Sequence, residues 1–357
     1  MTIKTFILHV AKYTGLFALM RRVTRKSPRI LCYHAGNIGD ERYYNPKLFC
    51  TSKQLRQRLE WLRTRGFVPA SLEQVIMPGG AGMAGMAGIP VAVTIDDGWY
   101  STYRDLLPAL AEYGHKPVLY LHSEACDAGA PIIPVTLRYL AWKASAREIT
   151  LEGYGVGMDG IWNLADARQR ESLVGAAEKW LNAEPPQAVA RCLERFGASL
   201  GVSAAELDLA SRRFSYMTTE ELRTASGAGC RIELHGHAHV YLPGQPHRNQ
   251  ENIELNRKRI RAAGLPYPTH YCYPSGCFDD YAPDVMRAAG VSTATTCIPG
   301  LVDLRDPDAR YYLPRFLDGG DVSMIEFEAE MCGVLAFLRA LTRRSQHPRR
   351  ALHPTTA

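Results

Sequence analysis

The chain has 357 residues, of which 46% are hydrophobic and 22% are charged, and its formal net charge is +6. These proportions are ordinary for a soluble globular protein, and the length suits one large domain or two modest ones. The positive excess is modest, and no basic patch with interleaved aromatic residues indicates binding to nucleic acid. Nine cysteines are scattered without the close spacing of a disulfide framework. This favours a reducing compartment and a cytoplasmic location.

The first 28 residues combine apolar stretches with a basic cluster. His9 and Lys12 interrupt the apolar residues, so the segment is too broken for a membrane-spanning helix. Four cations follow the second apolar stretch: Arg21, Arg22, Arg25 and Lys26. One interpretation is an amphipathic helix on an anionic membrane surface, which would place the protein at the inner membrane face. The other interpretation is a helix packed on the domain.

Beyond residue 28, short apolar runs alternate with helical patterns. Strands and helices are predicted, in chain order, at 29–34, 51–65, 67–70, 89–93, 103–113 and 117–121. Pro108 argues against a continuous helix over 103–113, because proline in a helix interior breaks or kinks the helix. A loop rich in Gly, Ala and Met occupies 79–88. The alternation predicts an α/β fold with a parallel sheet or barrel, whose chemistry lies at the carboxyl ends of the strands.

Between residues 127 and 214 the sequence pattern becomes helical, and the clearest predicted helices are at 167–181 and 186–200. We interpret this stretch as a helical insertion that overhangs the site. The alternation then resumes at 219–226, 231–234, 250–263, 271–273, 284–289 and 294–296, before a last helix at 323–341. The expected domain therefore covers 29–330, and 331–357 form the end of a helix and a basic tail.

Two short motifs carry the chemistry. The segment Thr94–Gly98, which contains Asp96 and Asp97, directly follows the apolar run at 89–93. Adjacent carboxylates repel each other unless a cation or a donor compensates. His235 and His239 are four residues apart, so on one helical turn both could reach one ion. On an extended strand, His237 would instead pair with either of them, because alternate side chains share a face.

Two imidazoles and one carboxylate leave a coordination position open for water, as in catalytic zinc sites. The second carboxylate is then free to act as a base. Taken singly, the Asp-Asp-Gly motif is typical of a surface turn, and the histidines could line an exposed strand edge. The presence of both motifs after strand-like runs favours the metal site.

As a set, these motifs resemble those of the polysaccharide deacetylase family, whose members share the chitooligosaccharide deacetylase homology domain. The matches are Thr94–Gly98, then His235–His239 with Gly236 in a Ser/Thr slot, then Tyr273–Gly276. The first and last strands also resemble those of the family's exopolysaccharide branch. The resemblance covers about 29–125 and 216–330, and it implies a distorted (β/α) barrel of about seven strands.

The resemblance also implies roles for individual residues. Asp96 matches the family's general base and Asp97 its carboxylate ligand, and His235 and His239 match the two histidine ligands. The backbone N–H of Ser275 falls where the family stabilises the oxyanion, a role that a main-chain donor keeps whatever its side chain.

Two departures from the family pattern concern the catalytic residues. Cys272 stands where many members have an arginine, and Arg315 would compensate for it, with a structural ion pair as the alternative. No Leu-x-His motif supplies an acid histidine near the end of the domain. In the exopolysaccharide branch a Tyr-His on the first strand does this work, and His34 occupies that slot. Its alternative interpretation is a histidine that caps a buried strand end.

The resemblance implies a metal-dependent carbohydrate N-deacetylase that acts on an amino-sugar glycan in exopolysaccharide or cell-envelope biosynthesis. Zinc is the expected metal, and cobalt, nickel or iron would suit the same ligands. Two other functions stay open at this point. One is a deformylase or deacetylase of lipid-linked sugars, and the other is a glycan-binding protein that retains the fold without the activity.

Overall fold

A computed structural model describes residues 2–77, 85–123, 131–155 and 157–342. Its parallel sheet runs in the order β11 (Thr293–Thr295), β10 (His270–Cys272), β9 (Arg231–Leu234), β6 (Val118–Leu121), β5 (Ile89–Asp97), β1 (Arg29–Tyr33) and β12 (Phe316–Leu317). A further strand, β4 (Phe67–Pro69), pairs with the first residues of β5. A parallel bridge joins Thr295 to Leu313, just before β12, so the sheet curves back on itself. The predicted distorted (β/α) barrel of about seven strands is confirmed.

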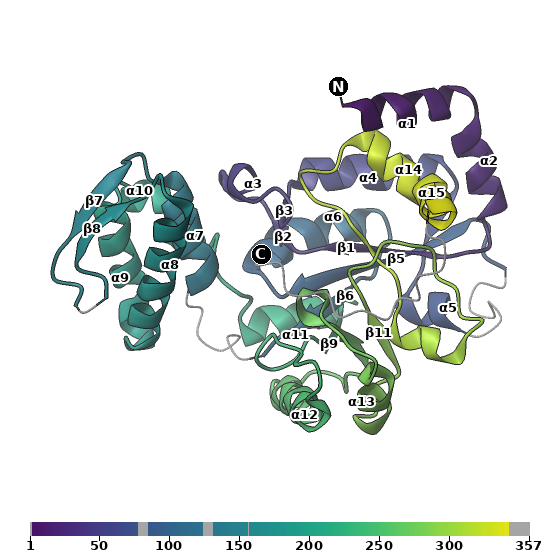
Figure 1. Ribbon diagram of the computed structural model, residues 1–357. Coiled ribbons are helices and arrows are strands. Elements are labelled where there is room, and N and C mark those ends of the chain that lie inside the picture. The colour runs from purple at the N-terminus through teal and green to yellow at the C-terminus, as the bar shows by residue number, and fades with distance from the viewer. Residues whose placement is uncertain (1, 78–84, 124–130, 156, 343–357) are drawn as a thin grey trace.

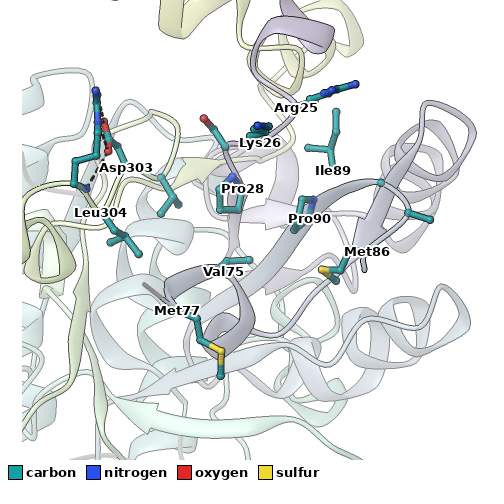
Figure 2. Close-up of a pocket in the computed structure, with 15 residues that line it drawn as sticks. Arg25, Lys26, Pro28, Val75, Met77, Met86, Ile89, Pro90, Asp303 and Leu304 are labelled. Carbon is teal, nitrogen blue, oxygen red and sulfur yellow. Dashed lines mark hydrogen bonds and ion pairs between the residues drawn. The ribbon is translucent and has the colours of Figure 1, made fainter. Parts of the chain in front are cut away.

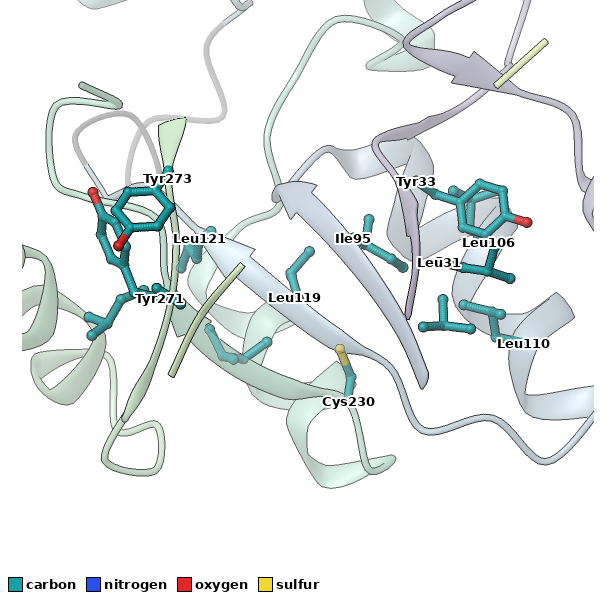
Figure 3. Close-up of a cluster of buried hydrophobic side chains, with 14 of the residues drawn as sticks. Leu31, Tyr33, Ile95, Leu106, Leu110, Leu119, Leu121, Cys230, Tyr271 and Tyr273 are labelled. Atoms are coloured by element: carbon teal, nitrogen blue, oxygen red, sulfur yellow. The ribbon is translucent and has the colours of Figure 1, made fainter. Parts of the chain in front are cut away.

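Successive residues of the strands face opposite sides of this sheet. Leu31, Val93 and Leu119 lie in the apolar cluster beneath the outer helices, part of which Figure 3 shows. Ala92 and Tyr120 belong to a second cluster inside the barrel. Because side chains alternate along a strand, the even-numbered residues of β5 point inward. This register directs Asp96 toward the barrel interior.

The outer helices include α4 (Ser52–Thr64), α5 (Leu72–Ile76), α11 (Thr219–Gly227), α12 (Pro246–Ala262) and α13 (Ala282–Ala288). The predicted helix at 103–113 is divided into a π-helical turn at Thr102–Leu106 and α6 (Leu107–Glu112). Pro108 therefore lies in the first turn of α6, where its missing N–H breaks no hydrogen bond. The proline marks a helix start within the predicted helix.

The predicted last helix is also divided, into α14 (Met324–Met331) and α15 (Val334–Thr342). Gly333 stands between them with a φ of 84°, which a glycine adopts without strain and which ends α14. The basic tail after Thr342 lies outside the described residues.

The insertion forms a lobe with its own apolar core. It contains α7 (Ile133–Lys143), α8 (Ala167–Asn182), α9 (Pro186–Ser199) and α10 (Ala204–Leu207), together with an antiparallel hairpin of β7 (Glu148–Leu151) and β8 (Gly160–Asn163). The sequence analysis missed this hairpin. Figure 1 shows the lobe to one side of the barrel, next to α3 (Glu41–Tyr44) and the short pair β2 (Ala35–Gly36) and β3 (Phe49–Cys50).

Ion pairs and hydrogen bonds attach the lobe to the segment that follows β1. Arg213 forms ion pairs with Asp40 and Glu41, and Tyr139 and Lys143 of α7 also bind Asp40, at 2.7 and 2.6 Å. The Arg213–Glu41 pair is shielded from water, and Asp40 is shared among three donors, so these contacts hold the lobe more firmly than an isolated surface ion pair would. The lobe is therefore attached beside the end of the barrel at which β1 finishes.

At the other side of the barrel, α1 (Ile3–Tyr13) and α2 (Leu16–Val23) pack on α14. Leu8, Phe17 and Met20 are buried there, and Lys4 and Lys12 form ion pairs with two glutamates of α14. No single described helix has the length and apolar character needed to cross a bilayer, although α1 and α2 together pass that test as a pair bent by 76°.

We predict that Leu119→Ala lowers the free energy of unfolding by about 2–5 kcal/mol, because the Leu119 side chain is fully buried at the centre of the sheet. Urea denaturation followed by circular dichroism would measure this change. The matched control is Ile161→Ala, whose side chain is exposed on β8 and whose loss should change stability little. Equal effects of the two substitutions would contradict the assignment of the core.

Candidate active site

Asp96 and Asp97 end β5 and point in different directions. Asp96 is 2% exposed and follows the inward register of the strand. Asp97 has a φ of 75°, and Gly98 follows with a φ of 89°. A left-handed backbone is unusual for an aspartate, and it turns the Asp97 side chain out of the strand register. The turn separates the two carboxylates and gives each a different set of partners.

Asp97 lies against the two predicted histidine ligands. Its Oδ1 atom is 3.3 Å from His235 Nε2 and 3.2 Å from His239 Nε2, and the two Nε2 atoms are 3.2 Å apart. Burial opposes ionisation of Asp97, but His239 and His235 outweigh it and hold the pKa of the carboxyl well below its ordinary value. Asp97 is therefore a carboxylate at neutral pH.

The two histidines are not on one turn of a helix, nor on an extended strand. They follow β9 in a loop, in which Gly236 has a φ of 75° and His239 a φ of 49°. These two left-handed residues fold the loop back, so that the ring of His239 returns to His235. His237 points elsewhere, because its Nδ1 atom lies 3.0 Å from Ser123 Oγ. The loop therefore brings His235 and His239 together, as one turn of a helix would, but through a different backbone conformation.

The arrangement of these atoms fits a divalent metal ion. Ligand atoms at about 2.0–2.1 Å from a tetrahedral zinc ion lie roughly 3.3 Å from one another, which matches the three distances among Asp97, His235 and His239. His235 Nδ1 is 2.8 Å from the carbonyl oxygen of Cys272, and a hydrogen bond there leaves Nε2 unprotonated for a metal. Trp99 Nε1 donates to Asp97 Oδ2 at 3.2 Å and orients the carboxylate.

Asp96 instead forms a buried ion pair with Arg315. Arg315 donates from both terminal nitrogens to the two oxygens of Asp96, at 2.7 and 2.8 Å, and its side chain is fully buried. Burial would raise the pKa of Asp96, but Arg315 lowers it to about 2. Two other groups of ligand-type side chains include Asp96, with Cys32 and His34 or with His235 and Cys272. The Arg315 cation disfavours a metal ion in either.

Arg315 also contacts Cys272, the residue that stands where the sequence resemblance leads us to expect an arginine. Arg315 also donates to the Cys272 sulfur at 3.0 Å and to the carbonyl oxygen of Thr296 at 2.9 Å. Burial raises the pKa of the Cys272 thiol well above its ordinary value, so the group stays neutral. A guanidinium from the closing segment of the barrel thus contacts both Asp96 and the neutral Cys272 side chain.

His34 and Ser275 lie near these carboxylates. His34 follows β1, and its Nε2 atom is 3.8 Å from Asp96 Oδ2, with 17% of its side chain exposed. The ring is therefore partly exposed beside Asp96. Ser275 is exposed in the turn after β10, where its φ of 54° directs the backbone away from the strand. Its turn begins two residues after Cys272, whose carbonyl faces His235.

Two further side chains contact Asp97 or His239, and neither was predicted from the sequence. His122 follows β6, and its ring centre is 5.0 Å from that of His239 and 4.7 Å from that of Tyr216. Burial lowers the pKa of His122 to about 3, so the ring is neutral. Trp99 is the other. The available signals were the position of His122 directly after the predicted strand at 117–121 and that of Trp99 directly after the Asp-Asp-Gly motif.

A cavity of about 960 Å³ lies at the opposite end of the barrel (Figure 2). It is lined by Pro28, which precedes β1, and by Ile89 and Pro90, which begin β5. These residues stand at the amino ends of strands whose carboxyl ends carry His34 and Asp96. The cavity is therefore separate from the metal-type site.

We predict that His235→Ala weakens zinc binding by more than the about 10–100-fold that loss of an outer-shell partner typically causes, because it removes one of three converging ligand atoms. His237→Ala is the matched control and should retain the metal, since its ring binds Ser123. Isothermal titration with zinc would measure both. Metal loss in His237→Ala, with binding intact in His239→Ala, would contradict the ligand set.

A profile described as polysaccharide deacetylase matches residues 201–294, which include His235 and His239. No curated protein matches the sequence at a significant level. Among solved structures, a Streptococcus pyogenes deacetylase, PplD, in complex with acetate has a TM-score of 0.54 and 14% identity, covering 85% of this chain and 98% of that one.

Two further structures are similar. A de-N-acetylase from Aggregatibacter actinomycetemcomitans has a TM-score of 0.52 and 14% identity, covering 85% of this chain and 98% of that one. IcaB from Ammonifex degensii has a TM-score of 0.50 and 16% identity, covering 86% and 97%. At these identities the likeness shows the fold alone. Part of the chain, residues 201–294, therefore resembles the polysaccharide deacetylase family, on a barrel fold that solved deacetylases share.

Proposed function

We propose that the protein is a metal-dependent hydrolase that removes N-acetyl groups from an amino-sugar glycan. The observation that carries this proposal is the approach of Asp97, His235 and His239 to within 3.3 Å of one another, beside a separate carboxylate held by Arg315. Three ligands and a free carboxylate are what hydrolysis of an amide by a metal-activated water requires. The match of residues 201–294 to the polysaccharide deacetylase profile supports the same reaction.

Each proposed site residue has its own role in the reaction. A divalent cation held by Asp97, His235 and His239 would lower the pKa of a coordinated water and polarise the acetamide carbonyl. Asp96, with a pKa of about 2, is ionised at working pH and accepts the proton of the attacking water. The Ser275 N–H donates to the developing oxyanion. His34, 3.8 Å from Asp96, delivers a proton to the departing amine.

Zinc is the proposed metal, because its tetrahedral geometry reproduces the distances among the three ligand atoms. Cobalt, nickel and iron accept the same imidazole and carboxylate ligands. Loading the metal-free protein with each ion in turn, followed by an activity assay, identifies the metal that the site uses.

The proposed substrate is a glycan of exopolysaccharide or cell-envelope biosynthesis. A sugar carried on a lipid is a second candidate, with an acetyl or a formyl group removed by the same chemistry. It is favoured by the apolar residues that α1 exposes, Ile3, Phe6 and Ile7 among them. The proposed location is the cytoplasm, at the inner face of a membrane. The free thiols of all eight cysteines within the described ranges support a reducing compartment.

Release of free amine from N-acetylated oligosaccharides tests the proposal directly. We expect amine to appear with the zinc-loaded protein and to disappear after treatment with a chelator, with recovery when zinc returns. A lipid-linked N-acetylated sugar and an N-formylated sugar, run in parallel, distinguish the substrates. Binding of the glycans without amine release from any of them would favour the glycan-binding alternative.

Asp96→Asn should keep the metal and lose turnover by about 10²–10⁴-fold, because the amide cannot accept the proton of water. Asp97→Asn is the comparison, and it should lose metal and activity together. Zinc titration and kcat measured on the same samples separate the two effects. Equal metal loss in both variants would mean that the carboxylates share their roles.

His34→Gln should lower kcat and leave zinc affinity unchanged, because the ring lies near Asp96 and outside the group formed by Asp97, His235 and His239. A loss of about 10²–10⁴-fold would be in line with a proton donor in the transition state. Steady-state kinetics on an N-acetylated oligosaccharide measures the change. Unchanged turnover would remove His34 from the mechanism and leave the acid to another residue.

A further inference from the structure

We propose that the outer faces of α1, α2 and α15 form one docking surface for an anionic membrane. We call it the terminal-helix face. Its apolar residues are all exposed: Ile3, Phe6, Ile7, Val10, Tyr13, Leu19, Val23, Phe337, Leu338 and Leu341. Single apolar residues scattered on a surface are ordinary, but a large exposed apolar patch is typical of an interaction site.

The first helix directs its broad apolar stripe outward. Ile3, Phe6, Ile7 and Val10 follow helical spacing and are 81%, 54%, 54% and 47% exposed, whereas Leu8 on the other edge is buried against α14. An amphipathic helix of a globular domain usually turns its apolar stripe inward. The inverted orientation of α1 leaves that stripe available to a partner.

The other two helices extend the same surface. Phe17 and Met20 anchor α2, while Leu19 and Val23 are exposed on its other side. α15 packs on α2 and exposes Phe337, Leu338 and Leu341. Figure 1 shows α1, α2, α14 and α15 grouped on one side of the barrel, away from the lobe. The two ends of the described chain therefore contribute to one face.

The charge of these segments selects an anionic partner. Residues 1–28 hold six of the 42 lysines and arginines and no aspartate or glutamate, whereas the remaining residues hold 36 of each sign. Lys4 and Lys12 form ion pairs with glutamates of α14, and Arg339 pairs with Glu330. Within the described residues, Arg21, Arg22, Arg25 and Lys26 form no ion pair, so these four cations are available to an anionic partner. Apolar side chains combined with a basic cluster supply the two contributions that stable peripheral binding to an acidic bilayer needs.

Other occupants of the face fit these observations less well. A second copy related by a twofold axis would bring basic clusters together, and their repulsion opposes association. The C-terminal residues 343–357 contain a single large apolar side chain, Leu352, so they cannot cover ten. A span of the bilayer by α1 and α2 would remove Leu8, Phe17 and Met20 from the domain. The surface of an anionic bilayer can contact both the apolar side chains and the cations of the terminal-helix face.

Sedimentation of the full chain with vesicles tests this assignment, and its readout does not depend on deacetylation. We expect strong binding to vesicles of phosphatidylcholine with 30% phosphatidylglycerol, weak binding to phosphatidylcholine alone, and release by high salt, because the attraction is partly electrostatic. Equal binding to both vesicles at all salt concentrations would overturn the electrostatic part of the proposal. Resistance to alkaline carbonate extraction would overturn surface docking in favour of a span.

Substitutions separate the contributions of the helices. The double change Phe6→Ser with Ile7→Ser, or Phe337→Ser with Leu341→Ser, should lower the partition coefficient at least tenfold. Arg22→Gln with Arg25→Gln should lower it about 30-fold, at about 1 kcal/mol per cation. The residues are exposed, and thermal melting would verify that each variant is folded.

Matched controls use equally exposed residues on other surfaces. Ile161→Ser with Tyr281→Ser controls the apolar changes, and Lys179→Gln with Arg191→Gln controls the charge changes. These variants should bind acidic vesicles as the unchanged chain does. Equal losses in test and control variants would overturn the proposal. So would a concentration-dependent dimer, seen by analytical ultracentrifugation, that the Phe6→Ser and Ile7→Ser changes dissociate without affecting vesicle binding.

Discussion

The buried ion pair between Asp96 and Arg315 constrains both the barrel and its chemistry. Arg315 lies on the segment that closes the barrel, and its guanidinium spans from the Thr296 carbonyl to Thr94 and Asp96 on β5. Loss of one partner of such a pair costs about 3–5 kcal/mol, because the other charge stays buried without compensation. The same contact keeps Asp96 ionised and fixed in direction. The closure of the barrel and the ionised state of Asp96, the proposed proton acceptor, therefore depend on one side chain.

The candidate site could be located from the sequence, but its backbone could not be derived. The order strand, Asp-Asp-Gly, strand, His cluster was sufficient to place Asp97 and His235 near each other, since parallel strands end at one edge of a barrel. The route of the loop depends on left-handed residues at Gly236 and His239. A histidine with positive φ is held by its surroundings, which no local pattern encodes. Spacing alone could not choose between helix and strand.

The fold was predictable where periodicity is strong, and less so where tertiary packing decides. The strands of the barrel are continuous apolar runs, so their type was evident. The break at Gly333 and the helix start at Pro108 each had a sequence signal that long apolar periodicity masked. The β7–β8 hairpin lacked such a signal, because β8 is largely exposed and has little apolar alternation. Its position depends on packing within the lobe, a long-range property.

Trp99 connects the lobe to the metal-type centre. Its indole N–H orients Asp97, and its backbone forms an antiparallel bridge with Tyr216, where the chain returns from the lobe. Tyr216 in turn lies against the ring of His122, which lies against His239. Two of the three ligand-type side chains are thus supported by residues at the base of the lobe. Because interiors are close-packed, a displacement of that base would be transmitted to the carboxylate and imidazole that it supports. The lobe is consequently part of the structure that holds Asp97 and His239 in place.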